Sequence, residues 1–357
     1  MWTAKHTQEP PCQSVSCKNS DCHECREEDI LSPEDAENFI YQAKQRGSFD
    51  MDSVRFISRS LCCVQSLEIL NQFVEGDEFL EHMLNTTDPK VQALAGSIFI
   101  KLMKFFYDKY RQPVYNFIIT HEINDLTLKT ISTCAMSLSK IIKRSDLSPT
   151  EFFTDELFTQ VNILLECSKN CAVISALNLA RRLIEKRADI NKFNYKQIFY
   201  LMCAQNPTVK QKAINASFIM SSVCCVSFSE DSINKILLIL ANTINESSFK
   251  ETAKAITFLL QMYLYSHQKV FNLAVDLFEK LVEILNNECS CVVPILSLII
   301  KMTEYSEENN YTEQILELFS DYNLDNALNE FINGNDDGKR YHAQRIRDFI
   351  DKNTNQD

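Results

Sequence analysis

The chain has 357 residues but only 5 glycines, and none of the 237 consecutive residues from 97 to 333 is a glycine. Glycine supplies the positive φ angles that tight hairpin turns need, and it lets a backbone approach a phosphate group closely. Phosphate-binding loops and dinucleotide-binding fingerprints require glycines at fixed spacings. The middle of the chain therefore excludes both motifs. Together with a hydrophobic content of 45%, the shortage of glycine predicts an all-α protein.

One amphipathic segment recurs along the chain. Its clearest copy runs from Thr87 to Phe106, where Asp88 and Pro89 form a helix start and apolar residues follow at helical spacing. Ala95 places a small residue in the middle of the apolar face. Comparable small residues return after steps of 40, 41, 37, 40, 44 and 46 residues, at Ala135, Ala176, Ala213, Ala253, Ser297 and Ala343. A period near 40 residues is typical of helical repeat proteins with two or three helices per unit.

This pattern resembles the armadillo and HEAT repeat families. The resemblance implies a right-handed α–α superhelix over residues 51–357, with about six repeats and an extended protein-binding surface. Importin-like armadillo proteins grip basic peptides with recurring Trp and Asn residues. Here the only Trp is Trp2, and no Asn ladder follows the small residues, since the positions six residues later include Lys101, Ile141, Arg182 and Ile219. Recognition of nuclear localisation signals is therefore not expected.

The apolar spacing and the short polar linkers predict a series of helices. We expect Phe105 and Phe106 to complete the core of one helix, and the ten Cys beyond residue 50 to pack mainly as small apolar residues. An exposed Phe106 or Tyr110 is the alternative, as part of a protein-binding groove. The expected helices are Met51–Glu75, Asp77–Leu84, Asp88–Phe106, Val114–Ile119, Asn124–Lys143, Thr150–Cys167, Ala172–Lys186, Tyr195–Cys203, Pro207–Cys225, Glu230–Ile244, Phe249–Tyr265, Gln268–Leu285, Cys289–Tyr305, Thr312–Tyr322, Leu324–Ile332 and Lys339–Lys352.

Residues 1–50 differ from the rest, because four thiols fall within 14 residues: Cys12, Cys17, Cys22 and Cys25. In an intracellular chain such a group indicates a metal site more readily than disulfides, and zinc is the metal that tetrahedral thiolate ligands favour. One structural Zn²⁺ is expected. A helix follows, which Ser32 caps and which ends at Arg46 and Gly47.

The run CQSVSCKNSDCHEC with the helix behind it resembles the AZUL zinc finger, the N-terminal module of ubiquitin ligases related to E6-associated protein. The resemblance covers roughly residues 10–51 and implies that Cys12, Cys17 and Cys22 bind zinc. In that family a further Cys after the helix completes the site, but Asp50 and Met51 stand at the matching position here. The fourth ligand is therefore Cys25, His23 or Asp50, or the site is degenerate. The HECT catalytic domain of the family has no counterpart in this sequence, so ligase activity is not implied.

The charge of the chain limits the kinds of partner that it can bind. The net charge is −12, and residues 302–357 hold 13 Asp and Glu against 5 Lys and Arg. Such a chain repels a phosphate backbone, so nucleic acid is not an expected partner. No signal peptide is recognisable and no stretch reaches the roughly 18 apolar residues of a membrane span. We expect a protein of the cytoplasm, with the nucleus as an alternative, that does not bind membranes.

No catalytic constellation is visible. The six His are scattered, with no pair at metal-binding helical spacing, and His82 is interpreted as a surface or packing residue. The sequence thus favours a non-catalytic scaffold or adaptor that binds partner proteins, linked to ubiquitin–proteasome proteins by the zinc module. One alternative is a karyopherin-like or phosphatase-regulatory subunit. The other is a component of a ubiquitin ligase.

Overall fold

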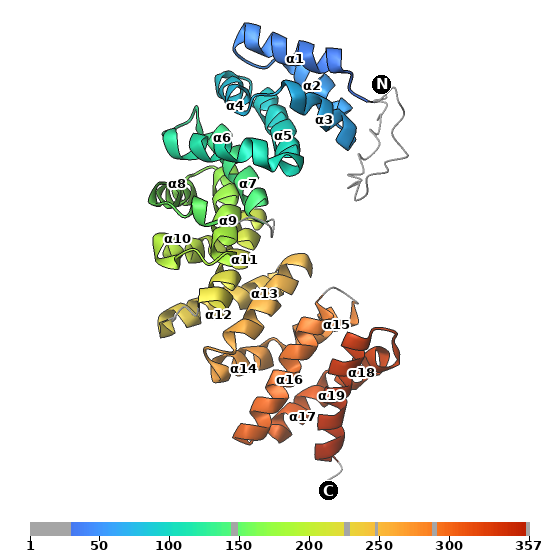
Figure 1. Cartoon of the computed structure of the whole chain (residues 1–357). Helices are drawn as coiled ribbons and strands as arrows, with labels where there is room; N and C mark the ends of the chain where they lie inside the picture. Colours follow the sequence, from blue (N-terminus) through green and yellow to red (C-terminus); the bar gives the residue numbers. More distant parts are fainter. Residues whose placement is uncertain (1–29, 144–148, 225–228, 247–248, 288–290, 355–357) are drawn as a thin grey trace, which may run out of the picture. The chain divides into compact units, whose positions relative to one another are not determined.

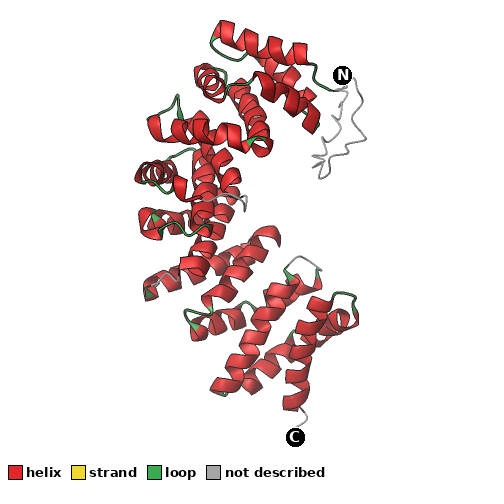
Figure 2. Cartoon of the chain, viewed as in Figure 1, coloured by secondary structure: helices red, strands yellow, loops and turns green. Residues whose placement is uncertain are grey.

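The computed structural model describes residues 30–143, 149–224, 229–246, 249–287 and 291–354 (Figure 1). These residues form 19 α-helices and three short 3₁₀ turns, and none of them lies in a strand (Figure 2). The all-α prediction is confirmed for this part of the chain. The chain divides into two compact units, residues 1–141 and 142–357, and each is described by itself.

Unit 1 contains two rows of helices. In the α5 row, α2 packs against α5, α3 continues α2, and α7 is joined to α5 by a hydrogen bond of 3.2 Å from Gln92 Nε2 to Thr130 Oγ1. In the α4 row, α4 packs against α6, and α1 covers α2 and α3. The helices are α1 (Pro33–Arg46), α2 (Met51–Ser60), α3 (Val64–Phe73), α4 (Gly76–Asn85), α5 (Pro89–Phe105), α6 (Tyr107–Thr120) and α7 (Leu128–Ile142).

Unit 2 repeats this arrangement. Successive long helices α9, α11, α13, α16 and α19 pack on one another and form the α11 row, which the remaining helices flank. The helices are α8 (Asp155–Glu166), α9 (Asn170–Glu185), α10 (Tyr195–Tyr200), α11 (Pro207–Cys224), α12 (Glu230–Glu246), α13 (Phe249–Met262), α14 (His267–Asp276), α15 (Phe278–Asn286), α16 (Val292–Asn309), α17 (Thr312–Asp321), α18 (Leu324–Asn333) and α19 (Asp337–Thr354).

The recurring small residues mark the helices of these two rows. Five of the seven are fully buried, namely Ala95, Ala135, Ala176, Ala213 and Ala343, while Ala253 and Ser297 are half-buried. Each lies on a long helix (α5, α7, α9, α11, α13, α16 or α19), where a short side chain lets a neighbour approach. The prediction of a helical repeat is confirmed. Helices α1 to α3 also pack in the rows of unit 1, although they carry no small residue 40 positions before Ala95.

Local signals account for the helix starts. Ser32 Oγ accepts a hydrogen bond of 3.1 Å from the backbone N–H of Asp35 at the start of α1. Asp88 accepts from Lys90 and Val91 at the start of α5, and Pro89 takes the first helical position. These side chains satisfy N–H groups that have no partner inside a helix. Both starts were predicted from the sequence, and both are confirmed.

Four predicted helices are divided in the structure. Met51–Glu75 forms α2 and α3, and Gln268–Leu285 forms α14 and α15. The first residues of Thr150–Cys167 form the 3₁₀ turn Pro149–Phe152 before α8, and the last residues of Tyr195–Cys203 form the 3₁₀ turn Leu201–Cys203 after α10. The breaks after α2 and α14 contain neither glycine nor proline, and the residues Leu61 and Leu277 at these breaks are buried. Apolar residues therefore continue at helical spacing through each turn, so a prediction made from that spacing cannot detect the break between the helices.

A chain of aromatic rings runs through the core of unit 1. It links Phe39 and Phe49 (centroids 5.4 Å apart), Phe79 (4.6 Å from Phe49), Phe99 (5.3 Å from Phe79) and Tyr110 (5.5 Å from Phe99). The hydroxyl of Tyr110 donates a hydrogen bond of 2.6 Å to Asn71 Oδ1, so this buried side chain has its polar atom satisfied. Phe39 places α1 in this core, although the sequence assigned residues 1–50 to a separate zinc module.

Candidate functional site

The predicted zinc ligands lie mostly beyond what the structure describes. Cys12, Cys17, Cys22, Cys25 and the alternative His23 all fall outside the described residues, so the zinc site stays a prediction. Among the described residues no group of three or more His, Cys, Asp and Glu side chains is placed to hold a metal ion.

Asp50, the third alternative for the fourth ligand, is described. Its carboxylate caps α2 by accepting hydrogen bonds of 3.1 and 3.0 Å from the backbone N–H groups of Asp52 and Ser53, and it pairs with Arg46. The helix start therefore accounts for this residue without a metal.

The cysteines of the helical region divide between core and surface. Cys63, Cys134 and Cys291 are buried, as expected for small apolar residues, and Cys167 is half-buried. Cys62, Cys171 and Cys203 are exposed, so the expectation of core packing is wrong for these three. They lie at or near helix ends, where the apolar spacing that suggested burial no longer fixes which side chain faces the core.

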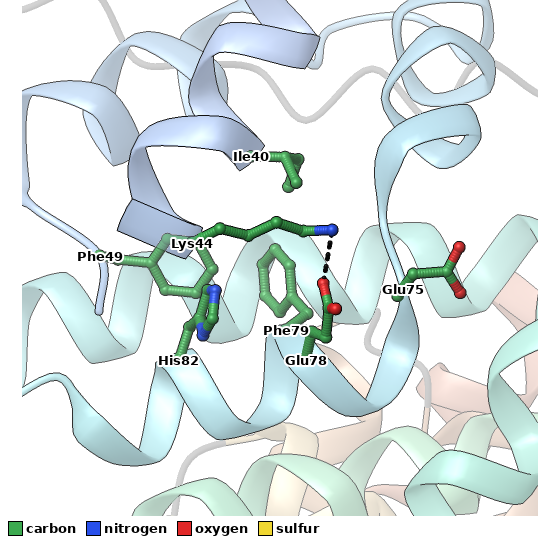
Figure 3. A pocket seen from close by; sticks show the side chains of 7 residues that line it. All are labelled: Ile40, Lys44, Phe49, Glu75, Glu78, Phe79 and His82. Carbon is green, nitrogen blue, oxygen red and sulfur yellow. Dashed lines mark ion pairs between the residues drawn. The ribbon is translucent and has the colours of Figure 1, made fainter. Parts of the chain in front are cut away.

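A small recess lies between α1 and α4 (Figure 3). Lys44 Nζ lies 2.7 Å from Glu78 Oε2 across it, and the ring of Phe49 lies 5.8 Å from that of His82. Burial lowers the pKa of His82 below its usual value, and His82 Nε2 is buried without a hydrogen-bond partner. The recess measures only about 10 Å³, which is room for one water molecule at most. It is too small for a substrate and is best described as the contact by which α1 packs on α4.

A larger groove of about 200 Å³ lies between α16 and α19. Its walls carry ion pairs from one helix to the other: Arg345 Nη2 lies 3.1 Å from Glu304 Oε1, and Lys352 Nζ lies 2.8 Å from Glu307 Oε1. Lys301 Nζ lies 2.5 Å from the other oxygen of Glu304. Two cations of α19 are thus paired with acids of α16 within the groove, and these pairs join the last helix of the row to its neighbour.

The exposed face of the α5 row is different. Helices α5 and α7 contain no Asp or Glu. Arg55 and Arg59 on α2, Lys104 on α5 and Lys140 on α7 are exposed. Among the described residues, Arg55, Arg59 and Lys140 have no ion-pair partner. Burial and then the neighbouring charge of Lys104 lower the pKa of Lys140, which means that two like charges lie close together.

Aromatic side chains accompany these charges. Phe56 on α2 is 50% exposed, and Phe105 at the end of α5 is 37% exposed. The Nζ of Lys104 lies 5.1 Å from the ring centroid of Phe105, within the range of a cation–π contact. The sequence predicted that Phe105 completes the core, which is wrong, because Phe105 is the last residue of α5 and its side chain is exposed. The alternative of an exposed Tyr110 is also wrong, since Tyr110 is fully buried.

Comparison with known proteins identifies the fold. No family model and no curated protein matches the sequence. An engineered protein of known structure superposes with a TM-score of 0.55 and 14% identity, covering 88% of this chain and 78% of its own. A designed armadillo repeat protein superposes with a TM-score of 0.51 and 11% identity, covering 66% of this chain and 99% of its own. No described helix is long and apolar enough to cross a membrane. The described part of the chain is similar to these structures and has an armadillo-like helical repeat fold.

Proposed function

We propose that this protein is a non-catalytic scaffold or adaptor that binds partner proteins on the exposed faces of its helix rows. The observation that carries the proposal is that α2, α5 and α7 expose both aromatic and basic side chains, among them Phe56 and Phe105. A stack of helices gives each row a long surface, which helical repeat proteins use for binding. Aromatic and Arg side chains are the residues that contribute most often to protein interfaces.

The zinc module belongs to the proposal as well. Cys12, Cys17 and Cys22, with Cys25 or His23 as the fourth ligand, would bind one structural Zn²⁺, and the AZUL resemblance suggests ubiquitin–proteasome proteins as the first partners to examine. The test is zinc stoichiometry on the purified full chain beside a Cys17→Ser/Cys22→Ser variant. We expect one tightly bound zinc that the variant loses. No zinc in the wild-type protein would remove the support for a link to the ubiquitin system.

The alternative functions call for a separate measurement. A karyopherin-like or phosphatase-regulatory subunit would use the same helical surface and is a special case of protein binding. A ubiquitin ligase component would accelerate ubiquitin discharge from a charged conjugating enzyme. We expect no acceleration by the full chain, since the proposal is non-catalytic. Partners are proposed to be proteins rather than nucleic acids or membranes, in the cytoplasm or the nucleus.

The experiment that tests the scaffold itself has two stages. Tagged full-length protein is purified from cells, and the proteins enriched with it are identified by quantitative mass spectrometry. Each enriched protein is then produced in pure form and titrated against the pure chain by calorimetry. We expect at least one to bind directly, with neither protein chemically altered. If none of them binds the pure chain, the scaffold proposal fails.

A further inference from the structure

The outer side of α2 combines positive charge with an exposed ring. Arg55 and Arg59 lie one helical turn apart and are exposed, and the ring of Phe56 beside them is 50% exposed. Within the part of the chain that the structure describes, neither arginine forms an ion pair. The one acid of this helix, Asp52, lies in its first turn. Arg55, Phe56 and Arg59 therefore form a basic surface with an apolar part, called the α2 face below.

Helix α17 of unit 2 presents the opposite charge. Glu313, Glu317 and Asp321 follow one another at intervals of four residues, so they form a stripe along one side of the helix. All three acids are exposed, and Tyr322 at the end of the helix is 37% exposed. Neither α17 nor the following helix α18 contains a Lys or an Arg. The three acids and Tyr322 are called the α17 face.

The basic residues of this part of the chain are engaged elsewhere. Residues 302–357 contain only five Lys and Arg. Four of them pair with other acids: Arg340 with Asp337, Arg345 with Glu304, Arg347 with Asp325, and Lys352 with Glu307. The Nζ of the fifth, Lys339, lies 5.9 Å from the ring centroid of Phe331. The acids of the α17 face thus have no ion-pair partner among the residues that the structure describes.

The stability of the single helices gives no reason for either face. Like charges four residues apart on a helix repel each other, which applies to Arg55 and Arg59 as well as to the acids of α17. Asp321 is the last residue of α17, and a negative charge is unfavourable at the C-terminal end of a helix. Both faces therefore cost some stability in the isolated chain, and an opposite charge placed against them removes that cost.

The two faces match in spacing as well as in sign. Helices α2 and α17 contain 10 residues each. Side chains four residues apart are separated by about 6 Å along a helix axis. Arg55 and Arg59 can therefore meet Glu313 and Glu317, or Glu317 and Asp321, at the same time.

We propose that the α2 face of one copy of this protein binds the α17 face of a second copy. Arg55 and Arg59 pair with two of the three acids, and Phe56 packs against Tyr322. Charge complementarity decides the occupant, because the chain itself carries both an unpaired basic face and an unpaired acidic face of the same spacing. The proposal goes beyond the scaffold function and does not depend on it.

The geometry of such a contact determines how association proceeds. The α2 face and the α17 face are different surfaces, so the contact is head to tail rather than between identical surfaces. Each copy in a pair keeps one face that a further copy can bind, unless the copies close into a ring. The average mass in solution should therefore rise steadily with protein concentration.

The oligomeric state of the full chain tests the proposal. Sedimentation velocity is recorded over a range of protein concentrations, at about 50 mM and about 500 mM NaCl. A reducing agent is present, so that the exposed cysteines form no disulfides between copies. We expect association in the lower salt, and an association constant at least about tenfold smaller in the higher salt, because salt screens exposed charges. A monomer at every concentration in low salt would overturn the proposal.

Charge reversal at each face gives a sharper test. Arg55→Glu/Arg59→Glu places acids against acids, and Glu313→Lys/Glu317→Lys places cations against cations. Each variant alone is therefore expected to be monomeric. Mixed in equal amounts, the two variants again present faces of opposite charge to each other, and we expect association to return.

Three further variants serve as controls. Lys196→Glu/Lys235→Glu makes the same charge change as the α2 variant at exposed lysines of α10 and α12, and is expected to associate as the wild type does. Arg55→Lys/Arg59→Lys keeps the charge and is expected to retain association. Phe56→Ala is expected to weaken association by a smaller factor than charge reversal. Circular dichroism establishes that every variant is folded.

Three other results would also overturn the inference. Association of either reversed variant alone, to the extent seen in the wild type, would show that the two faces are not the contact. A mixture of the two folded variants that stays monomeric would show that the faces do not meet. If the wild type is monomeric and a partner protein loses affinity for Arg55→Glu/Arg59→Glu, the α2 face binds that partner instead, and the scaffold function stands.

Discussion

The α5-row face and the α16–α19 groove are built from similar side chains but use them in opposite ways. Both lie on the long helices of a repeat, and both carry several charges. Between α16 and α19, Glu304 and Glu307 are each paired with a cation of the neighbouring helix. On the α5 row, the charge of Lys104 helps to lower the pKa of Lys140, and α5 and α7 themselves contain no Asp or Glu.

The difference separates ion pairs that join neighbouring helices from like charges that lie close to one another. A cross-helix pair at the surface contributes modestly to stability, because water and salt screen it. Neighbouring like charges cost some repulsion, so the fold alone gives no reason to place Lys140 close to Lys104. In this protein, the α5 row is therefore the better place to look for a partner.

The largest expected effect tests whether the two units can be compared as separate bodies. Phe99→Ala removes a fully buried ring from unit 1, and Phe278→Ala removes one from unit 2. Each is expected to cost about 3–5 kcal/mol, through lost burial and the cavity that remains. Hydrogen exchange followed by mass spectrometry should show faster exchange mainly in the unit that carries the substitution. Equal acceleration in both units would mean that they unfold together, and the comparison by unit would lose its basis.

A smaller effect distinguishes the two charged regions directly. Glu304→Gln breaks the pairs with Arg345 and Lys301, and is expected to lower the free energy of unfolding by up to about 1 kcal/mol. Lys140→Gln removes repulsion with Lys104 and is expected to leave stability unchanged or slightly raised. Urea titrations of both variants measure this, and added salt should reduce the loss at Glu304. A clear loss of stability in Lys140→Gln would mean that Lys140 stabilises the fold, and the distinction between the two regions would then fail.

The smallest expected effect concerns pH. Burial lowers the pKa of His82, while Glu78 and Glu81 oppose this and Lys44 adds to it. The unfolded chain therefore binds a proton at His82 more readily than the folded chain, and stability falls as pH drops below the usual His value of about 6.5. Because His82 is only half-buried, the loss should stay below about 1 kcal/mol. Unfolding titrations at about pH 7 and about pH 5.5 should show a larger decrease for the wild type than for His82→Gln. Equal decreases would assign the pH dependence to other groups.

Much of the fold was predictable, because it follows from local and periodic signals. Asp88 and Pro89 predict the start of α5, and the small residues from Ala95 to Ala343 lie on the long helices of the rows. Turns were harder to predict, since Leu61 and Leu277 continue the apolar period through a break. The exposed face was missed. Phe105 resembles a core residue in sequence, and only its place at the end of α5 leaves it outside.

The sequence by itself determined the helical class, the repeat and the positions of most helices, because spacing, capping and the lack of glycine act within a few residues of one another. Tertiary structure alone decided which charges meet. Glu304 and Arg345 are 41 residues apart and form a pair, whereas Lys104 and Lys140, 36 residues apart, are near enough for the charge of Lys104 to lower the pKa of Lys140. Such relations depend on which helix faces pack together. A charge pattern read along the chain therefore cannot distinguish a structural ion pair from a surface left open for a partner.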